Sequence, residues 1–269
     1  MQLALETEAV IRAEGALPAT IAIIDGRIRV GLTEANIERL ARKREPVHKV
    51  SRRDLSYVVA RSLNGATTVA ATMWIAHRAG IRIFSTGGIG GVHREARESF
   101  DISADLYELA RTPVAVVASG VKSILDIAAT LEMLETLGVP VVGLGTSEFP
   151  AFYSRTSGHR LPQSVKDESE AARVIDAHFG LGIDTGLLIA HPVPEADQIP
   201  FDQMEVHIAR ALQMQTGAGI RGKEITPFLL SRIMELTGGR SMQANLALLK
   251  ANARAAARIA VKLSKQDER

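Results

Sequence analysis

The chain has 269 residues, of which 46% are hydrophobic and 23% are charged, and it contains no cysteine. These proportions are typical of a folded globular protein, and the lack of thiols excludes disulfides, thiolate metal sites and cysteine nucleophiles. Because 32 basic residues face 30 acidic ones and aromatic residues make up 4%, neither a broad nucleic-acid surface nor base-stacking platforms are expected.

The first residues predict a helix followed by a hairpin. Apolar residues spaced among acids predict a helix that runs to about Ala13. Residues 20–24 and 27–30 have the composition of two short strands, and the Asp25-Gly26 pair between them is typical of a two-residue hairpin turn.

The rest of the chain alternates between strand and helix patterns. Strands are expected at 47–50, 81–84, 114–118, 141–144 and 187–189, and helices at 33–44, from Ser51 with Asp54, at 67–79, after Asp101, and at 124–137, 202–215 and 241–262. Residues 154–163 and 192–200 are expected to be loops because of their glycine, proline and polar content. This alternation predicts a single α/β domain, residues 1–269, with three α/β/α layers around a largely parallel central sheet.

No apolar run reaches the roughly 18 to 20 residues that a membrane span needs. The first eight residues, Met1 to Glu8, include acids and lack the basic start of a secretory signal. We therefore expect a cytoplasmic protein that associates with neither a membrane nor nucleic acid.

A glycine-rich segment from Ser85 to Arg94 directly follows one of the predicted strands. Glycines allow backbone N–H groups to approach an anion closely, so this loop suits a phosphate, although its spacing matches no nucleotide-binding fingerprint. The alternative is a tight chain reversal that needs positive φ angles. In the same way, His93 either binds the phosphate or only satisfies hydrogen bonds within the loop.

Residues 101–105 contain two carboxylates, Asp101 and Asp105, with the hydroxyl of Ser103 between them. Such oxygens near a helix start can hold a hard divalent ion that keeps most of its waters. The alternative is that Asp101 or Ser103 caps the helix.

Lys122 comes shortly after a predicted strand, where α/β folds place ligand sites. A lysine that is partly desolvated or beside another cation can form a Schiff base with a carbonyl carbon, whereas most lysines are solvated surface groups. Lys49, Arg52 and Arg53 lie at a strand-to-helix junction that suits a phosphate, with a surface salt-bridge cluster as the alternative.

An ordered set of segments carries a family resemblance: 18–22, 49–54, 64–70, 86–94, 100–105, 122–126 and 223–230. Together they closely resemble the pseudouridine-5′-phosphate glycosidases, a family that includes indigoidine synthase A-like proteins. The resemblance runs from residue 1 to about 260. It implies reversible cleavage of the C–C glycosidic bond of pseudouridine 5′-phosphate to uracil and ribose 5-phosphate, a lyase reaction of the hydro-lyase type in pseudouridine degradation. It also implies a divalent ion, usually Mn²⁺, and a homotrimer.

The resemblance also implies the roles of individual residues. Lys122 matches the nucleophilic lysine, Asn245 a second catalytic residue, and Asp101 the metal ligand. The implied substrate contacts are Lys49, Val69, Thr86, His93, Ser103, Ala104 and Asp105. These roles agree with the chemistry of the residues, because a C–C glycoside offers no oxygen leaving group for two-carboxylate hydrolysis and an imine at C1′ supplies an electron sink.

One departure concerns the proton donor. The family carries a strand with an Ala-Leu-Glu-Ser-Thr motif and a His-Gly loop before its first helix, and that glutamate is the donor. Residues 4–7 are superficially similar, but the register of the following residues places Glu6 inside the helix, so we assign it no catalytic role. We therefore expect an N-terminally shortened chain with impaired turnover, since a positioned proton donor is typically worth about 10² to 10⁴ in rate.

Two other functions remain open from the sequence. One is a non-catalytic sugar-phosphate-binding or assembly subunit, which would bind ligand without releasing uracil. The other is a different Schiff-base lyase that acts on another sugar phosphate, since a lysine and a phosphate site do not specify the nucleobase.

Overall fold

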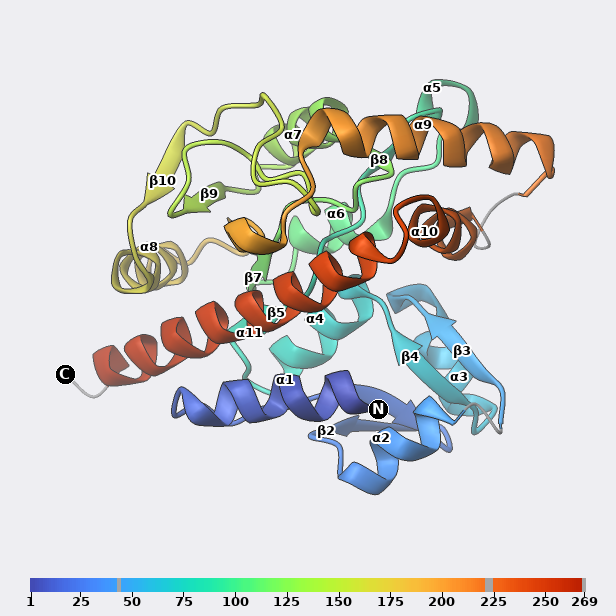
Figure 1. Ribbon diagram of the computed structural model, residues 1–269. Coiled ribbons are helices and arrows are strands. Elements are labelled where there is room, and N and C mark those ends of the chain that lie inside the picture. Colours follow the sequence, from blue (N-terminus) through green and yellow to red (C-terminus); the bar gives the residue numbers. More distant parts are fainter. Residues whose placement is uncertain (43–44, 221–224, 268–269) are drawn as a thin grey trace.

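The computed structural model describes residues 1–42, 45–220 and 225–267, and Figure 1 shows their arrangement. The helices are α1 (Gln2–Ala13), α2 (Glu34–Ala41), η1 (Arg52–Asp54), α3 (Leu55–Ala60), α4 (Val69–Arg78), α5 (Ala96–Ser99), α6 (Ala104–Leu109), α7 (Ile127–Thr136), α8 (Glu168–Gly180), η2 (Glu195–Asp197), α9 (Phe201–Gly217), α10 (Ile225–Leu236) and α11 (Arg240–Asp267). The strands are β1 (Ile21–Ile24), β2 (Arg27–Val30), β3 (Val47–Val50), β4 (Asn64–Thr67), β5 (Ile83–Ser85), β6 (Val92–His93), β7 (Ala115–Ala118), β8 (Leu125–Asp126), β9 (Val141–Leu144), β10 (Gln163–Val165) and β11 (Leu187–Ala190).

A parallel sheet forms the centre of the molecule, with the strand order β10-β9-β11-β7-β5. Its inner strands β9, β11 and β7 are largely buried, whereas the edge strands β10 and β5 are more exposed. The residues of β7 show how both faces are covered. Val116 and Ala118 join the core on one face, where α4, α6 and α7 pack, whereas Ala115 and Val117 join the core against α8 and α11. The predicted three-layer α/β/α architecture with a largely parallel sheet is therefore confirmed.

Residues 21–67 form a separate sheet with the order β2-β1-β4-β3, which differs from the expected continuous alternation. The hairpin is confirmed, because Ile24 pairs with Arg27 across Asp25 (φ 50°) and Gly26 (φ 70°). β1 then pairs antiparallel with β4, while β3 and β4 are parallel. A strand–helix alternation in sequence does not reveal which sheet a strand joins, so this division was not foreseen.

Helix α4 connects the two sheets. Val69 and Met73 lie in the large core against the parallel sheet, whereas Ala71 and Ile75 lie in the smaller core under the four-stranded sheet. Thr68 caps this helix by accepting a hydrogen bond from the N–H of Ala71. The small sheet is thereby held at a fixed distance from the ends of β5 and β7.

Several boundaries differ from the predictions for local reasons. The helix expected from residue 124 begins only at Ile127, because Leu125 and Asp126 pair with β6 and the Asp126 side chain then caps α7. The helix capped by Thr33 ends at Ala41, and its predicted end at Arg44 lies outside the described residues. Helix α8 and strand β10 were not predicted.

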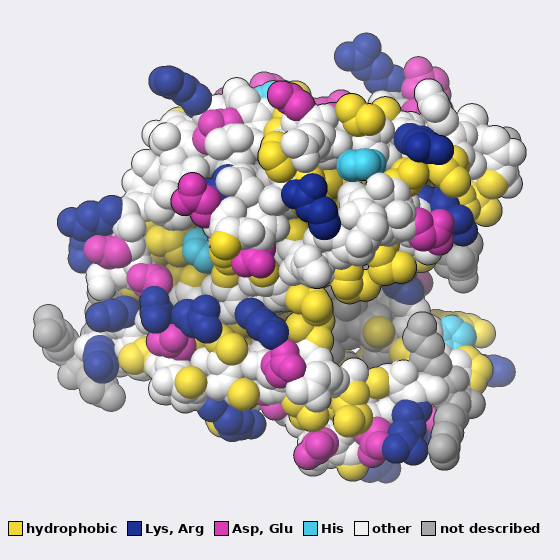
Figure 2. Space-filling model, in the orientation of Figure 1, with side chains coloured by type: hydrophobic (Ala, Val, Ile, Leu, Met, Phe, Trp, Pro, Cys, Tyr) yellow, Lys and Arg dark blue, Asp and Glu magenta, His cyan; other side chains and the backbone are white. Residues whose placement is uncertain are grey.

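The first helix lies against the last one, as Figure 1 shows. Basic side chains form a row along α11, visible in Figure 2. Lys250 pairs with Glu6 of α1, and Arg254 and Arg258 pair with Glu14, the residue that follows this helix. Glu6 is thus a helical residue held in an ion pair, which confirms its predicted placement. Among the described residues, no helix has both the length and the apolar character to cross a membrane.

Candidate functional site

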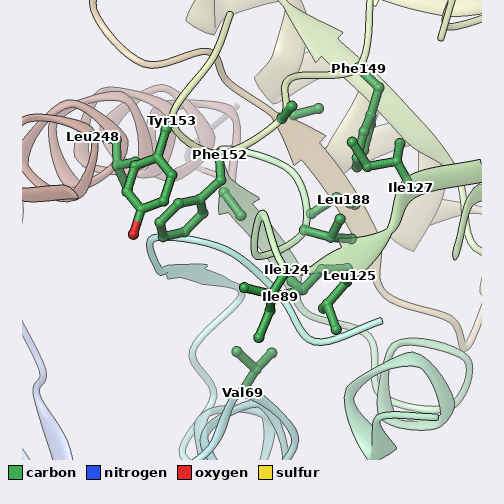
Figure 3. Close-up of a cluster of buried hydrophobic side chains, with 14 of the residues drawn as sticks. Val69, Ile89, Ile124, Leu125, Ile127, Phe149, Phe152, Tyr153, Leu188 and Leu248 are labelled. Atoms are coloured by element: carbon green, nitrogen blue, oxygen red, sulfur yellow. The ribbon is translucent and has the colours of Figure 1, made fainter. Parts of the chain in front are cut away.

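Two loops meet at the carboxyl end of the parallel sheet, which is where ligands bind in α/β folds. Residues 86–91 follow β5, and residues 119–124 follow β7. They are joined by backbone bonds, because the N–H of Ile89 donates to the carbonyl of Gly120 and the N–H of Lys122 donates to the carbonyl of Ile89, each at 3.1 Å. Figure 3 shows Ile89 beside Ile124 and above Val69, in the buried cluster under the loops.

The glycines of the first loop are needed for close approach and not for special backbone angles. None of Gly87, Gly88, Gly90 and Gly91 has a positive φ, so the alternative of a tight reversal is wrong. A Cβ atom on Gly90 would lie 2.1 Å from the Ser103 hydroxyl oxygen. A Cβ atom on Gly88 would lie 2.6 Å from the ring of Phe152. These contacts leave room for backbone alone.

Asp105 is the internal anchor of the site. Its carboxylate is 4% exposed and accepts the N–H of Ala70 at 2.9 Å through one oxygen and the N–H of Gly90 at 2.8 Å through the other. The capping interpretation holds for Ser103, whose hydroxyl accepts the N–H of Asp105 at the start of α6. Ala104 is the first residue of that helix. Asp105 therefore ties α4, α6 and the glycine-rich loop together.

Lys122 is partly buried between these elements. Burial lowers the pKa of its ammonium group, the negative charge of Asp105 opposes this shift, and the positive charge of Lys49 adds to it. Lys49 itself is exposed on β3. A lowered pKa increases the fraction of free amine at neutral pH, which is the form that attacks a carbonyl carbon.

His93 interacts electrostatically with both lysines. Burial lowers the pKa of its imidazole, Asp101 opposes the shift, and the charges of Lys122 and Lys49 reinforce it. Its Nε2 atom is 3.7 Å from Oδ2 of Asp101, and the backbone N–H of His93 donates to the backbone carbonyl of Asp101. The sequence-predicted Lys49, His93, Asp101, Asp105 and Lys122 are thus brought into one neighbourhood.

Asp101 and Asp105 do not share a helix face, because α6 begins only at Ala104. Asp105 is occupied by backbone donors, which leaves Asp101 as the carboxylate available to a cation. Its side chain is 40% exposed. In residues 1–42, 45–220 and 225–267 there is no cluster of three or more His, Asp or Glu side chains placed to hold a metal. The donor set fits an ion that stays largely hydrated.

The other expected contacts surround the same loops. Thr86 begins the glycine-rich loop and donates its N–H to the Val117 carbonyl. The side-chain oxygen of Asn245, from α11, would be 3.5 Å from a Cβ atom placed on Gly87. Val69 is the first residue of α4 and is 8% exposed.

The two arginines suggested for the phosphate are directed elsewhere. Arg52 donates to both oxygens of Glu108, at 2.8 and 3.1 Å, and Glu108 is fully buried. The Arg53 side chain is 90% exposed and lies 3.8 Å from Asp54. Arg52 thus forms an ion pair with a buried glutamate, which differs from the surface salt-bridge cluster of the alternative, and Arg53 stays exposed. Lys223, part of the 223–230 motif, lies outside the described residues.

Sequence reasoning missed a polar group behind the loops. Asn252, Ser119 and His191 form a hydrogen-bonded set around the carbonyl of Thr86. Its one trace in the sequence is an asparagine within the alanine-rich C-terminal helix. Arg94 was included in the glycine-rich motif, but its pairing with Glu205 of α9 and with the carbonyl of Ser123 was not foreseen.

Known proteins are similar to this chain over nearly its whole length. The family model of indigoidine synthase A like protein matches residues 1–262. A pseudouridine-5′-phosphate glycosidase from Nocardioides sp. is 58% identical over 258 residues, which cover 96% of this chain and 84% of that protein. Another, from Deinococcus radiodurans, is 54% identical over 265 residues, covering 98% and 84%.

Two solved structures are also similar. The prealnumycin C-glycosynthase AlnA, crystallised in complex with ribulose 5-phosphate, has a TM-score of 0.93 at 39% identity and covers 100% of this chain and 88% of its own. An indigoidine synthase A-like protein from Thermotoga maritima has a TM-score of 0.89 at 40% identity, covering 97% and 86%. The chain therefore belongs to the indigoidine synthase A-like family.

Proposed function

We propose that the protein is a pseudouridine-5′-phosphate glycosidase, a lyase that reversibly cleaves the C–C glycosidic bond of pseudouridine 5′-phosphate to uracil and ribose 5-phosphate in pseudouridine degradation. Relatives of that name at 54% to 58% identity over nearly the whole chain support the substrate. The observation that carries the proposal is Lys122, a partly buried amine of lowered pKa beside Lys49 and Asp105, at the carboxyl end of the parallel sheet.

In the proposed reaction, Nζ of Lys122 attacks C1′ while the bond from C1′ to the ring oxygen breaks and that oxygen takes a proton. The nitrogen lone pair then forms a C=N bond to C1′ as the C1′–uracil bond breaks, and uracil C5 takes a proton. Water finally hydrolyses the imine, which releases ribose 5-phosphate and restores Lys122. Formation of the C=N bond drives the cleavage, and the electron pair of the broken C1′–uracil bond stays on uracil C5, where the proton is added. A desolvated lysine of lowered pKa suits the attacking role.

The other residues bind the substrate in this proposal. Lys49 and His93, with Thr86 and the backbone of the glycine-rich loop, hold the phosphate. Ser103 and Ala104 at the start of α6, with Asp105, contact the sugar, and Val69 gives an apolar contact. Asn245 contacts the reacting sugar or base. Glu6 takes no part, because it lies in α1 and is paired with Lys250.

Asp101 would hold Mn²⁺ through its carboxylate and through waters, in keeping with its exposure and with the single carboxylate available. Such an ion supplies positive charge next to the phosphorylated sugar. The proposal also includes one domain over residues 1–269, a homotrimer and a cytoplasmic location, for which the family resemblance is the support.

Uracil release from pseudouridine 5′-phosphate with added manganese tests the function. We expect slow uracil formation with the unchanged chain, because no residue is assigned as the positioned proton donor. The same rate is expected with Lys166→Ala, a control that removes a lysine whose side chain is 75% exposed. Lys122→Ala should form none, because the nucleophile is lost. Uracil formation by Lys122→Ala at the unchanged rate would contradict the assignment.

A second candidate is suggested by the likeness to a C-glycosynthase, whose fold is shared although its named product is different. A Schiff-base enzyme for another C-glycoside would use the same lysine and phosphate site. Competition among the 5-phosphates of pseudouridine, uridine and ribose for the binding site separates the two candidates. An enzyme specific for the uracil C-glycoside should bind pseudouridine 5′-phosphate selectively. Binding of ribose 5-phosphate without uracil release would instead indicate a non-catalytic sugar-phosphate-binding or assembly subunit.

A further inference from the structure

A buried amide on the last helix contacts the loops of the proposed site from behind. Asn252 of α11 is completely buried. Its Nδ2 atom donates to the carbonyl of Thr86 at 2.9 Å and to the hydroxyl of Ser119 at 3.1 Å. One side chain thus holds the first residue after β5 and the first residue after β7.

The orientation of this amide is fixed by a histidine. Oδ1 of Asn252 lies 2.9 Å from Nδ1 of His191, the residue that follows β11. An amide oxygen can only accept, so His191 donates from Nδ1. Burial lowers the pKa of His191, while the hydrogen bond to Asn252 and the charge of Glu168 oppose this shift and Arg155 adds to it. The hydrogen bond from Nδ1 of His191 therefore fixes which way the amide points.

The two loops are connected at the same place through the backbone. The N–H of Ser119 donates to the carbonyl of Gly87 at 2.9 Å. Gly120, which is next in the chain, has a φ of 79°, and a Cβ on it would lie 2.1 Å from the Pro150 carbonyl. This tightly constrained segment leads directly to Lys122. A shift at Ser119 is therefore passed along a stiff connection to the nucleophile.

Burying an amide in an apolar helix face is costly unless its hydrogen bonds are made. Other buried positions of α11 avoid this cost because they carry apolar side chains, such as Leu248 and Ile259 in the two cores. At position 252 the chain has a polar side chain whose donors and acceptor are all used. Packing alone does not require this, whereas alignment of two loops does.

We propose that Asn252 is a positioning residue, which holds the glycine-rich phosphate loop and the Lys122 loop in register. The inference rests on the proposed function, because it assigns the two loops to the phosphate and to the nucleophile. Asn252 does not touch the reacting atoms in this view. It acts through Thr86 and Ser119.

The test compares Asn252→Asp and Asn252→Ala with Ile259→Ala, a matched control on the same helix. The aspartate keeps the shape and the contact to His191 but turns an oxygen toward the Thr86 carbonyl, and the alanine removes all the bonds without adding charge. The measurements are kcat and KM for pseudouridine 5′-phosphate, the Kd of ribose 5-phosphate by calorimetry, and the free energy of unfolding in urea. Since small misplacements of reacting groups can cost about 100-fold, we expect kcat/KM to fall about 10- to 100-fold in both Asn252 variants.

Ile259→Ala should lose stability but keep kcat, KM and the Kd of ribose 5-phosphate. If the Asn252 variants match it, with kinetic and binding constants within about twofold of the unchanged chain, Asn252 is only structural and the inference is wrong. If the unchanged chain releases no uracil, the proposed function fails, and the inference is then decided by the Kd. Weaker ribose 5-phosphate binding in the Asn252 variants alone supports it. An equal Kd in all the chains, or no binding by any of them, overturns it.

Discussion

At Gly90 the backbone of the glycine-rich loop, the cap of α6 and the carboxylate of Asp105 meet in a space that has no room for a side chain. A Cβ atom there would lie 2.1 Å from the Ser103 hydroxyl oxygen and 2.8 Å from Oδ2 of Asp105. The N–H of Gly90 also donates to that carboxylate. At the scale of the residue, the site depends on the closeness of approach that the glycine allows.

Replacing Gly90 with alanine should therefore destabilise the protein and displace the loop. We expect a loss of about 1 to 3 kcal/mol in the free energy of unfolding in urea, as overpacking of a well-packed site typically produces. Gly180→Ala is the matched control, since that glycine ends α8 and a Cβ on it meets no atom within 4 Å. Equal stabilities of the two variants would show that the close approach at Gly90 is not a real constraint.

The sequence predicted the glycine-rich loop as a phosphate site but offered a wrong physical alternative for its glycines. Positive φ and close approach both favour glycine, and only the positions of Ser103, Thr130 and Phe152 around the loop distinguish them. Those neighbours come from distant parts of the chain. For the same reason the partners of Asn252 were not predictable, because Thr86, Ser119 and His191 meet it only after the sheet has formed.

At the scale of the element, α6 and η1 join the small sheet to the parallel sheet. Glu108 of α6 is fully buried and accepts hydrogen bonds from Arg52 of η1, from Arg111 and from Thr112. The guanidinium of Arg52 also lies 5.9 Å from the ring centroid of Trp74 on α4. Arg52 thus holds the segment that carries Lys49 against the helix that carries Asp105.

Arg52→Ala should leave the buried Glu108 short of a partner, whereas Arg53→Ala removes a side chain that is 90% exposed. We expect a loss of about 1 to 3 kcal/mol in unfolding free energy for the first change, since an under-satisfied buried acceptor costs this much. The second should change stability by less than about 0.5 kcal/mol. Thermal or urea denaturation of the pair checks this, and a larger effect of Arg53→Ala would reverse our assignment of the two arginines.

Strong local signals made most elements predictable. The hairpin at Asp25 and Gly26, the capping residue Thr33, and the buried strand β7 have residues whose local preferences agree with the fold. The four-stranded sheet and the short pair β6-β8 depend on long-range pairing, for which the sequence pattern gives no register.

At the scale of the whole molecule, the proposed site combines residues from the small sheet, from the loops after β5 and β7, and from helix α11. The small sheet supplies Lys49, and the ends of β5 and β7 lead into the glycine-rich loop and Lys122. Helix α11 contacts these loops with Asn245 and Asn252. The chain belongs to the indigoidine synthase A-like family. The central claim is that Lys122 is the nucleophile of the proposed reaction.

Reductive trapping with borohydride in the presence of ribose 5-phosphate, followed by peptide mass spectrometry, tests that claim most directly. An imine forms from the free amine, and burial lowers the pKa of Lys122, which raises the fraction of free amine at a given pH. We predict that the reduced sugar-phosphate adduct is found on the peptide that contains Lys122 and is absent from Lys122→Ala. An adduct on Lys49 in place of Lys122, or a Lys122→Ala chain trapped as readily as the unchanged one, would contradict the account.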